Sequence, residues 1–564
     1  MMDKSGKSYI KMEGEIHDDG LYTVTDCIKH FAEIKAENEA FVFADHVGGR
    51  QAVTFADIYE KSTAVARSLV KLGVKKGELI AINLRNCPEW LYLQFGVMFS
   101  GAVPVSISFT YKDGSDLIAL MKKLGNCCLL ALDPGVDGLN WQIVKKLLIR
   151  YSPDGTASSD KLPSLRYVIG HEVGWKNSRE MTGVKTISEL VNETNPAVTC
   201  PIIDKDDAAF FVQTSGSTGV PKLVVHTHRS IMTVRQLGSV GLVDSSVVQY
   251  NDRPFCWIGG FPMSIVTGQK RVTVSGFSPI PDDRVTSLID IVQKEKCTLL
   301  TALPPLLHGL IRAENIPADW PVNAVLTGGQ PLTKGIAASI GKVAPIISAN
   351  YGGTEFLIAS SGEIHDVGDF REYYSGDICK IPGLELKVVD ESGEIVPVNT
   401  RGEIYVRSPG MFREYHNDPE KTAAVFTDDH WFKTDDIGIM TKDAELFIYG
   451  RISNMIISGG MNVTPEILEQ AIKTCPGVAT VVIVPVPDEI YYQVLCACVI
   501  RKTGSNLTEE QLRSYCNEIH NDSRRMFTVL PKYYMFFDVF PETITGKTDR
   551  VQLRKLAKKA FCSS

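Results

Sequence analysis

Segments with helical spacing alternate with short β-branched runs along this chain, and this alternation most constrains its fold. Residues 52–74 carry apolar side chains at helical spacing, and residues 77–84 follow as a strand-like run. The alternation continues near the C-terminus in the runs VVIVPV and CACVI. We therefore expect an α/β or mixed architecture. At 564 residues, the chain is long enough for two or more compact units.

The composition excludes several classes of protein. With 44% hydrophobic and 22% charged residues, it is typical of a soluble globular protein and not of a disordered, fibrous or membrane chain. The formal net charge of -7 and the lack of long basic runs give no electrostatic footprint for nucleic acid. The 13 cysteines lack the paired CxxC spacing of a tetrahedral zinc site, so we expect reduced thiols.

Targeting signals are not evident in the sequence. Residues 1–20 have neither an apolar signal core nor the arginine-rich character of a transit peptide, and the ending FCSS differs from an SKL-type peroxisomal address. The longest apolar stretch, Trp90 to Ile107, is interrupted by Gln94 and glycines, and it reads as a buried helix followed by a strand. We expect a cytoplasmic protein without a transmembrane segment, and the sequence leaves the oligomeric state open.

A domain boundary is predicted near residue 450. The strand-like run ELFIYG ends there, and helical spacing resumes in PEILEQAIKTCPGV before further strands. We predict a first domain at residues 1–450 and a second at residues 451–564. Because domain junctions commonly form ligand clefts, we expect the chemistry between these two units.

A strand followed by a serine- and glycine-rich loop is suited to binding a polyphosphate. Glycines let backbone amides approach an anion closely, hydroxyls donate hydrogen bonds, and the lysine supplies positive charge. The residues concerned are Thr214, Ser215, Gly216, Ser217, Thr218, Gly219 and Lys222. The loop is not a Walker A motif, because Pro221 precedes the lysine and no Gly-Lys-Ser/Thr ending is present. For this motif alone, the alternative is a Ser/Gly-rich surface turn.

Five segments in order resemble the signature series of the acyl-adenylate-forming superfamily, which contains acyl-CoA synthetases, peptide-synthetase adenylation domains and beetle luciferases. They are TSGSTGVPK, NYGGTE, WFKTDDIG, YGRISNMIISGGMNVTPEILE and TITGKTDR. The resemblance implies a large N-terminal domain of β-sheets flanked by helices and a small mobile α+β C-terminal domain. It also implies that a carboxylate attacks the α-phosphate of MgATP, which yields acyl-AMP and pyrophosphate.

The resemblance assigns roles to residues within these motifs. Residues Thr214 to Lys222 would bind the β- and γ-phosphates of ATP. Tyr351 and Gly352 would pack against the adenine. Thr354 would bind the α-phosphate, and Glu355 would hold Mg²⁺, which prefers oxygen ligands used together with substrate phosphates.

Three further residues complete the implied nucleotide site. Asp436 matches the family carboxylate that binds the ribose hydroxyls, and Arg451 matches the arginine beside the ribose and phosphate. Lys547 matches the lysine that bridges the attacking carboxylate and the α-phosphate, and we predict it as the main catalytic residue. Asp435 stands where the family usually has glycine, so it adds a negative charge beside the ribose.

The loop ISGGMNV separates CoA ligases from enzymes that only adenylate. Ser458, Gly459 and Gly460 resemble the segment that lines the pantetheine tunnel of CoA ligases, and CoA is therefore the expected acceptor. The alternatives are a nucleotide- or acyl-binding pseudoenzyme and an adenylate-forming enzyme with a different acceptor. Ile457 stands where beetle luciferases have a lysine, which argues against light emission.

The predicted acid pocket departs from the family pattern. Trp257 replaces a histidine that is familiar in many aryl and fatty acyl ligases, so we expect a reshaped acyl site. Gln330 adds a polar amide near the adenine or the acyl wall, and Gly329 and Gly353 are assigned to the same pocket. We expect a fatty or aryl acid as substrate.

Two histidines follow the phosphate loop. His228 fits the family's threonine-histidine pair, whereas His226 reads only as a strand residue. We expect both to make contacts at the edge of the core, and we base no metal site on them.

Overall fold

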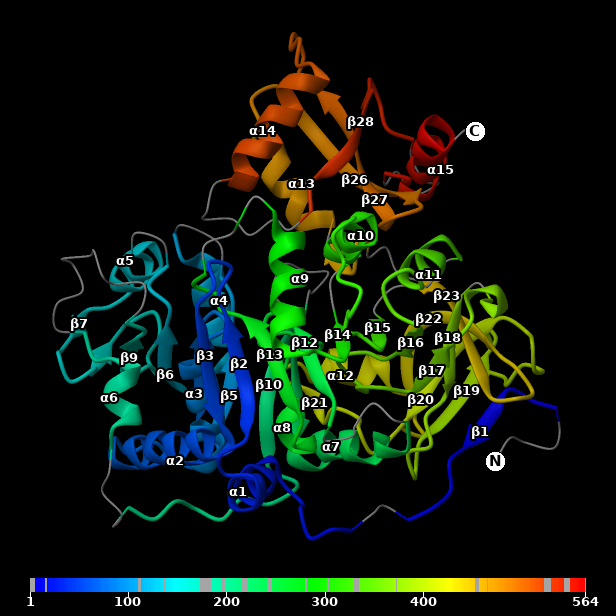
Figure 1. Cartoon of the computed structure of the whole chain (residues 1–564). Helices are drawn as coiled ribbons and strands as arrows, with labels where there is room; N and C mark the ends of the chain where they lie inside the picture. The colour runs from blue at the N-terminus through cyan, green and yellow to red at the C-terminus, as the bar shows by residue number, and fades with distance from the viewer. Residues whose placement is uncertain are drawn as a thin grey trace.

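The computed structural model describes most of the chain. The described residues are 6–15, 18–109, 113–135, 138–172, 184–193, 198–214, 222–240, 246–278, 281, 283–301, 304–328, 334–371, 373–451, 456–463, 465–521, 529–541 and 548–562. They form a large N-terminal domain and a small C-terminal domain, each built from strands and helices (Figure 1). This is the α/β architecture that the sequence predicts. Across the described ranges, no helix has both the length and the apolar character needed to cross a membrane.

A long mixed sheet forms the centre of the large domain. Its strands, in spatial order and within the described residues, are β1 (Tyr9–Lys11), β19 (Glu385–Val389), β20 (Gly402–Arg407), β22 (Phe432–Met440), β23 (Glu445–Arg451), β18 (Tyr374–Ile378), β17 (Ser360–Ile364), β16 (Ile346–Tyr351), β15 (Ala324–Gly328), β14 (Leu299–Thr301), β12 (Val248–Asn251), β13 (Lys270–Val274), β2 (Glu39–Ala44) and β3 (Arg50–Thr54). From β16 to β2 the strands are parallel, and from β16 to β1 they are antiparallel.

A second sheet lies in the same domain. Its order is β21 (Glu414–Tyr415), β11 (Lys222–Thr227), β10 (Ala208–Thr214), β5 (Val103–Ser106), β4 (Leu79–Asn83), β6 (Cys127–Leu132) and β9 (Tyr167–Gly170). Strands β10, β5, β4, β6 and β9 run parallel, whereas β10 and β11 form an antiparallel pair. The short strands β7 (Arg150–Tyr151) and β8 (Ala157–Ser158) pair beside it.

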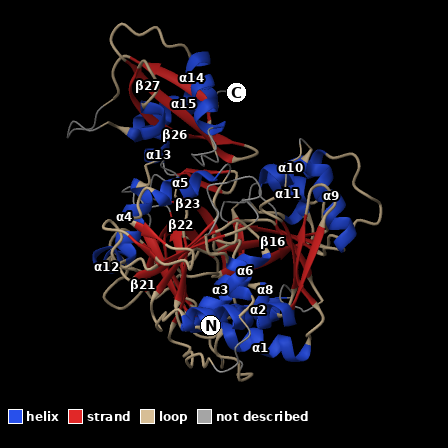
Figure 2. Cartoon of the chain, turned by 90° about the vertical axis from the view of Figure 1, so that its left-hand side faces the viewer, coloured by secondary structure: helices blue, strands red, loops and turns tan. Residues whose placement is uncertain are grey.

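Helices flank these sheets, as Figure 2 shows from the side. Those of the large domain are α1 (Val24–Ile34), α2 (Phe55–Lys71), α3 (Pro88–Phe99), α4 (Ser115–Leu124), α5 (Leu139–Lys145), α6 (Ile187–Val191), α7 (His228–Met232), α8 (Ser264–Thr267), α9 (Arg284–Glu295), α10 (Pro304–Arg312), α11 (Lys334–Ile340) and α12 (Pro419–Val425). Helix α2 begins with a capping box, in which Thr54 and Asp57 each bind the other's backbone N–H.

The core of the large domain explains why the longest apolar stretch does not span a membrane. Helix α3 begins with Pro88 and is buried from Trp90 to Met98. A helix that is apolar on all sides is stable only where it is covered on all sides, and α2 packs along α3. The stretch then continues into β5, so it forms the predicted buried helix followed by a strand.

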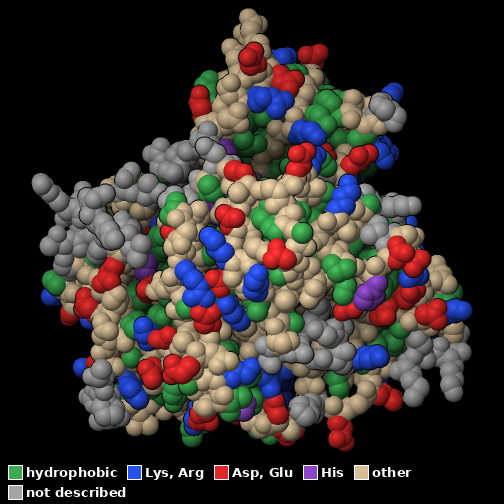
Figure 3. All heavy atoms as spheres, viewed as in Figure 1, with side chains coloured by type: hydrophobic (Ala, Val, Ile, Leu, Met, Phe, Trp, Pro, Cys, Tyr) green, Lys and Arg blue, Asp and Glu red, His purple; other side chains and the backbone are tan. Residues whose placement is uncertain are grey.

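In its described residues, the small domain is a sheet covered by three helices. Its strands are β25 (Met461–Val463), β24 (Ile456–Ser458), β27 (Tyr492–Arg501), β26 (Val478–Asp488) and β28 (Pro531–Phe537), and its helices in the described residues are α13 (Pro465–Lys473), α14 (Glu509–Asn521) and α15 (Arg550–Phe561). The buried side chains of the long hairpin β26–β27 point alternately into two apolar clusters. On the face seen in Figure 3, the surface is hollowed where this domain meets the large one.

Candidate active site

The two ends of the serine- and glycine-rich loop are held side by side. Thr214 ends β10 and Lys222 begins β11, and these two residues are partners in the antiparallel register. The predicted phosphate-binding residues Ser215, Gly216, Ser217, Thr218 and Gly219 lie outside the described residues. The loop thus leaves and rejoins the sheet at one point, and β21 lies beside its second strand.

A tyrosine links Lys222 to Glu355. Nζ of Lys222 lies 4.6 Å from the centroid of the Tyr415 ring and 3.4 Å from the phenolic oxygen. The Tyr415 hydroxyl donates a 2.8 Å hydrogen bond to Oε1 of Glu355. Tyr415 is buried on β21, which pairs with β11. The structure therefore joins the predicted phosphate residue and the predicted metal residue through a side chain that no motif contained.

Thr354 and Glu355 lie in a tight turn that follows β16. A Cβ atom on Gly352 would lie only 1.9 Å from the carbonyl oxygen of Leu357, so any side chain at position 352 would displace the backbone of the turn. Gly353 lies in the same turn, and its carbonyl accepts a 2.8 Å hydrogen bond from the N–H of Leu357. Glycine is thus required here for close packing of the backbone.

His226 holds the backbone of this turn. Burial lowers the pKa of His226 to about 4, so the ring is neutral at neutral pH. Nε2 lies 2.7 Å from the carbonyl oxygen of Thr354, and because a carbonyl only accepts, Nε2 carries the proton. Nδ1 lies 3.0 Å from the Ser230 hydroxyl. His226, for which we predicted no role in a motif, therefore positions the backbone of Thr354, the residue before Glu355.

Tyr351 and Asp436, which come from different motifs, are in direct contact. The Tyr351 hydroxyl donates a 2.8 Å hydrogen bond to Oδ2 of Asp436, and both side chains are buried. Asp436 is also the register partner of Arg451 across β22 and β23. The three residues predicted to contact adenine, ribose and phosphate are thus brought together by the sheet.

Ser458, Gly459 and Gly460 lie at the tip of a β-hairpin. Ser458 ends β24 and pairs with Met461 at the start of β25. Gly459 and Gly460 have φ values of 58° and 78°, and positive φ at both central residues is typical of a type I′ turn. The N–H of Gly459 donates a 2.9 Å hydrogen bond to the carbonyl of Tyr491. The predicted CoA segment is therefore a turn whose backbone requires its glycines.

Comparison with known proteins identifies the family. The family model described as AMP-binding enzyme matches residues 28–416, and the model described as AMP-binding enzyme C-terminal domain matches residues 468–547. The chain belongs to the AMP-binding enzyme family. It is an ATP-dependent, AMP-forming ligase of this family.

Curated relatives match this AMP-binding enzyme over nearly its whole length. The mitochondrial medium-chain acyl-CoA ligase ACSF2 of Danio rerio is 28% identical over 560 residues, which cover 95% of this chain and 88% of that protein. The 4-coumarate--CoA ligase 3 of Arabidopsis thaliana is 28% identical over 530 residues, which cover 90% of this chain and 86% of that protein.

Solved structures share the fold. A mutant o-succinylbenzoate CoA synthetase, MenE, of Bacillus subtilis has a TM-score of 0.71 at 21% identity, and the match covers 94% of this chain and 98% of that one. The amide bond synthetase McbA of Marinactinospora thermotolerans has a TM-score of 0.73 at 20% identity, with 95% and 99% covered. These likenesses show the two-domain fold of adenylate-forming enzymes.

The departure at Asp435 has a conformational cost in this AMP-binding enzyme. Asp435 has a φ of 63°, in the left-handed region that favours glycine, and Asp is among the few other residues that adopt it readily. Its N–H donates a 3.2 Å hydrogen bond to Oε1 of Glu403. Burial, and the negative charge of Asp435, raise the pKa of Glu403. The left-handed backbone at position 435 therefore suits the glycine that the resemblance leads us to expect there.

The predicted acid pocket is only partly described. Trp257 is half-buried in the turn between β12 and α8, where its carbonyl accepts hydrogen bonds from the N–H groups of Gly260 and Phe261. Gly329 and Gln330 lie outside the described residues, as does the predicted catalytic Lys547. Their placement in the site stays a prediction.

Tyr415 and His226 are the site residues that the motifs did not predict. Tyr415 lies 193 residues from Lys222 in the sequence, and their contact depends on the pairing of β21 with β11. His226 has a weak signal, because it lies four residues after Lys222 on the same strand. Neither role is visible without the register of the sheet.

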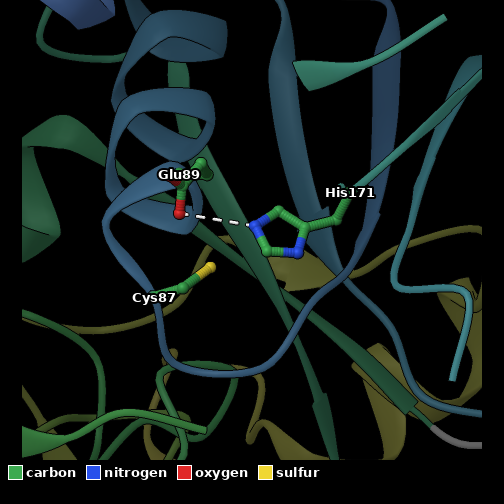
Figure 4. A group of neighbouring side chains, drawn as sticks. All are labelled: Cys87, Glu89 and His171. Atoms are coloured by element: carbon green, nitrogen blue, oxygen red, sulfur yellow. Dashed lines mark hydrogen bonds and ion pairs between the residues drawn. The ribbon is translucent and has the colours of Figure 1, made fainter. Parts of the chain in front are cut away.

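A second group of titratable side chains lies outside the signature motifs. Cys87, Glu89 and His171 each place one potential ligand atom within 4.8 Å of the others (Figure 4). Nε2 of His171 lies 3.4 Å from Oε2 of Glu89, and burial raises the pKa of the Cys87 thiol well above its ordinary value. Burial therefore favours the protonated thiol, and the three side chains form a contact cluster in which Cys87 and His171 are buried and Glu89 is half-buried.

Proposed function

We propose that this protein is an acid:CoA ligase that uses MgATP. In the first half-reaction, the carboxylate of the acid attacks the α-phosphate, which forms acyl-AMP and releases pyrophosphate. In the second, the CoA thiol attacks the acyl carbonyl and loses its proton, the thioester forms, and AMP leaves. The proposed substrate class is a fatty or aryl acid, in line with relatives named medium-chain acyl-CoA ligase and 4-coumarate--CoA ligase.

A single turn carries this proposal. Residues 351–355 bond to Asp436 through Tyr351 and to Tyr415 through Glu355, and Tyr415 also contacts Lys222. In ATP, the α-phosphate lies between the ribose and the β- and γ-phosphates. A turn that connects a ribose-binding carboxylate to a phosphate-binding lysine therefore supports a position of Thr354 at the α-phosphate, where the acid attacks.

The residues at Glu355 fit a bound Mg²⁺. Oε1 accepts the hydrogen bond of Tyr415, and within the described residues no donor occupies Oε2. Mg²⁺ is ordinarily held by one or two carboxylates together with substrate phosphates. It would neutralise charge that develops on the phosphoryl oxygens.

The small domain supplies the remaining proposed groups. Lys547 bridges the attacking carboxylate and the α-phosphate in this proposal, and the turn at Ser458 to Gly460 lets the pantetheine arm of CoA pass close to the backbone. The domain limits of 1–450 and 451–564 stay predictions. A cytoplasmic location also stays a prediction, and the ACSF2 relatives are named mitochondrial.

The test measures release of pyrophosphate and AMP from MgATP with a panel of fatty and aryl acids, with and without CoA. We expect at least one acid to support AMP release that rises about tenfold or more when CoA is added, because the thiol clears the acyl-AMP from the site. Acid-dependent pyrophosphate release that CoA does not accelerate would favour a different acceptor. The absence of release with every acid would favour a pseudoenzyme.

A further inference from the structure

Two arginines lie in or against the turn that carries Trp257, Arg271 buried and Arg253 half-buried, and they differ in their hydrogen bonding. Arg271 is fully buried, and its guanidinium donates to the backbone carbonyls of Asn251, Gly260 and Phe261 at 2.6 to 3.3 Å. Arg253 donates no side-chain hydrogen bond to any described residue, and its Nε is sealed from solvent. Arg271 therefore holds the turn together, whereas Arg253 has donors without acceptors.

The backbone of Arg253 is nevertheless fixed. Its N–H donates a 3.2 Å hydrogen bond to Oδ1 of Asn251. Its carbonyl accepts from Nδ2 of Asn86 at 3.0 Å and from Nη2 of Arg271 at 3.4 Å. The unpaired guanidinium is thus presented from a rigid support, as binding groups usually are.

The charges around Arg253 are not balanced. Asp252 is the carboxylate that influences both Arg253 and Arg271, and burial raises its own pKa. Oδ1 of Asp252 has no hydrogen-bond partner among the described residues. Two guanidinium groups therefore lie near one carboxylate that burial disfavours, and among the described residues no ion pair joins Asp252 to either arginine. A partly buried charge of this kind is costly unless a ligand pairs with it.

The tip of Arg253 points to an open part of the turn. Nη1 lies 3.0 Å from the place that a Cβ on Gly259 would occupy, and Gly259 is exposed. Gly259 follows Trp257, which is predicted to line the acid pocket, by two residues. A glycine at this position leaves Nη1 uncovered where a larger side chain would lie against it.

We infer that Arg253 binds a second anionic group of the acid substrate, so that the acid is a dicarboxylic acid or carries an equivalent anionic tail. This inference rests on the proposed function and names its substrate class. A planar guanidinium binds a carboxylate through two parallel hydrogen bonds, and the terminal nitrogens Nη1 and Nη2 supply them while Nε stays sealed in the protein. An acid with a purely apolar tail would leave the donors of this half-buried guanidinium unpaired, and sites built to bind a polar group discriminate strongly against such analogues.

The experiment compares straight-chain dicarboxylic acids, from succinate to dodecanedioate, with monocarboxylic acids of matched length. We expect the purified protein to prefer a dicarboxylate in acid-dependent AMP release. Arg253→Met should lower kcat/KM for that dicarboxylate about 10- to 100-fold, mainly through KM, and leave the KM values of ATP and CoA unchanged. The monocarboxylate of matched length should lose little. Arg253→Lys should recover part of the preference, and Arg150→Met, at an exposed position on β7, is the matched control.

Binding without turnover separates this inference from the proposed function. We expect the preferred dicarboxylate to raise the melting temperature of the wild type but not of folded Arg253→Met. If no acid drives AMP release but this difference is present, the proposed function fails and the anion site stands. Three results for Arg253→Met would each overturn the inference. They are an equal loss of kcat/KM for dicarboxylates and monocarboxylates, a change confined to the KM of CoA, and an unchanged preference for the dicarboxylate.

Discussion

The Tyr415 hydroxyl donates to Oε1 of Glu355 while the same ring lies under Nζ of Lys222. One buried phenol therefore connects the end of the serine- and glycine-rich loop with the turn that follows β16. The contact fixes the carboxylate at one oxygen, and no donor among the described residues occupies the other, where Mg²⁺ is proposed to bind. It also keeps the lysine close to the place where the β- and γ-phosphates are proposed to bind.

Removing this hydroxyl should weaken the use of MgATP. Tyr415→Phe keeps the ring under Lys222 and deletes the hydrogen bond to Glu355, so we expect kcat/KM for MgATP in pyrophosphate release to fall about tenfold. The Mg²⁺ concentration for half-maximal activity should rise as well. Tyr167→Phe, on β9, is the control, because the Tyr167 hydroxyl donates to the carbonyl of Leu72 at the end of α2, outside the site. Similar kinetics for both variants would show that Tyr415 is only a packing residue.

Asp435 allows its charge and its backbone to be tested separately. Asp435→Asn keeps a side chain that tolerates left-handed φ but removes the negative charge, so we expect the KM for ATP to fall about two- to threefold. Asp435→Ala removes that tolerance as well and should lower the free energy of unfolding by about 1 kcal/mol. Urea unfolding and ATP titration measure the two effects. A rise in the ATP KM of the Asn variant would contradict the proposed repulsion.

The sequence predicted the parts of the site that depend on local backbone chemistry. Position 352 leaves no room for a Cβ atom, and positions 459 and 460 have positive φ values. Glycine is favoured at all three positions for these reasons, so the spacing of the glycines already indicates the turns. The α/β fold and the buried helix before β5 were predictable for a similar reason. The spacing of apolar residues, which indicates helices, strands and their buried faces, can be read from a short stretch of sequence.

The remaining contacts depend on sheet register, which the sequence does not reveal. Tyr415 acts on Lys222 only because β21 pairs with β11, and His226 acts on Thr354 only because β11 lies against the turn after β16. The unpaired state of Arg253 becomes visible only in contrast with Arg271. Long-range pairing therefore sets the part of the chemistry that motif spacing cannot predict.

Acid should destabilise the fold through its buried histidines. Burial lowers the pKa values of His226 and His228 from 6.5 to about 4. Between these values the unfolded chain binds protons that the folded protein does not, so the free energy of unfolding falls as the pH drops from 6.5 toward 4. Each histidine should contribute a loss of about 2 kcal/mol between roughly pH 7 and pH 5.

The variant His226→Gln tests this contribution. An amide can still donate to the Thr354 carbonyl but does not titrate, so the loss of stability on acidification should shrink by the share of one histidine. Urea unfolding at neutral and mildly acidic pH measures it, with the exposed His365→Gln as control. If the free energy of unfolding of His226→Gln depends on pH as that of the wild type does, groups other than His226 cause the acid sensitivity.

Lys547→Ala should separate the two half-reactions. If Lys547 bridges the carboxylate and the α-phosphate, its loss should slow acid-dependent pyrophosphate release about 100-fold or more. Thioester formation from preformed acyl-AMP and CoA should remain largely intact, because AMP departure does not require this bridge. Rapid-quench assays of each step measure the two rates. Equal loss in both steps would remove the assigned role.

Gly460→Ala should produce the opposite pattern. Gly460 has a φ of 78° at the tip of the β24–β25 hairpin, so a Cβ there would cost about 1–2 kcal/mol and distort the turn. Because this turn is proposed to line the path of pantetheine, transfer to CoA should slow and the KM for CoA should rise, while pyrophosphate release in the absence of CoA stays near the wild-type rate. Gly504→Ala, at another positive-φ turn of the small domain with open space around it, controls for strain alone. If Gly504→Ala slows transfer equally, the effect of Gly460→Ala reflects the stability of the small domain and not the thiol path.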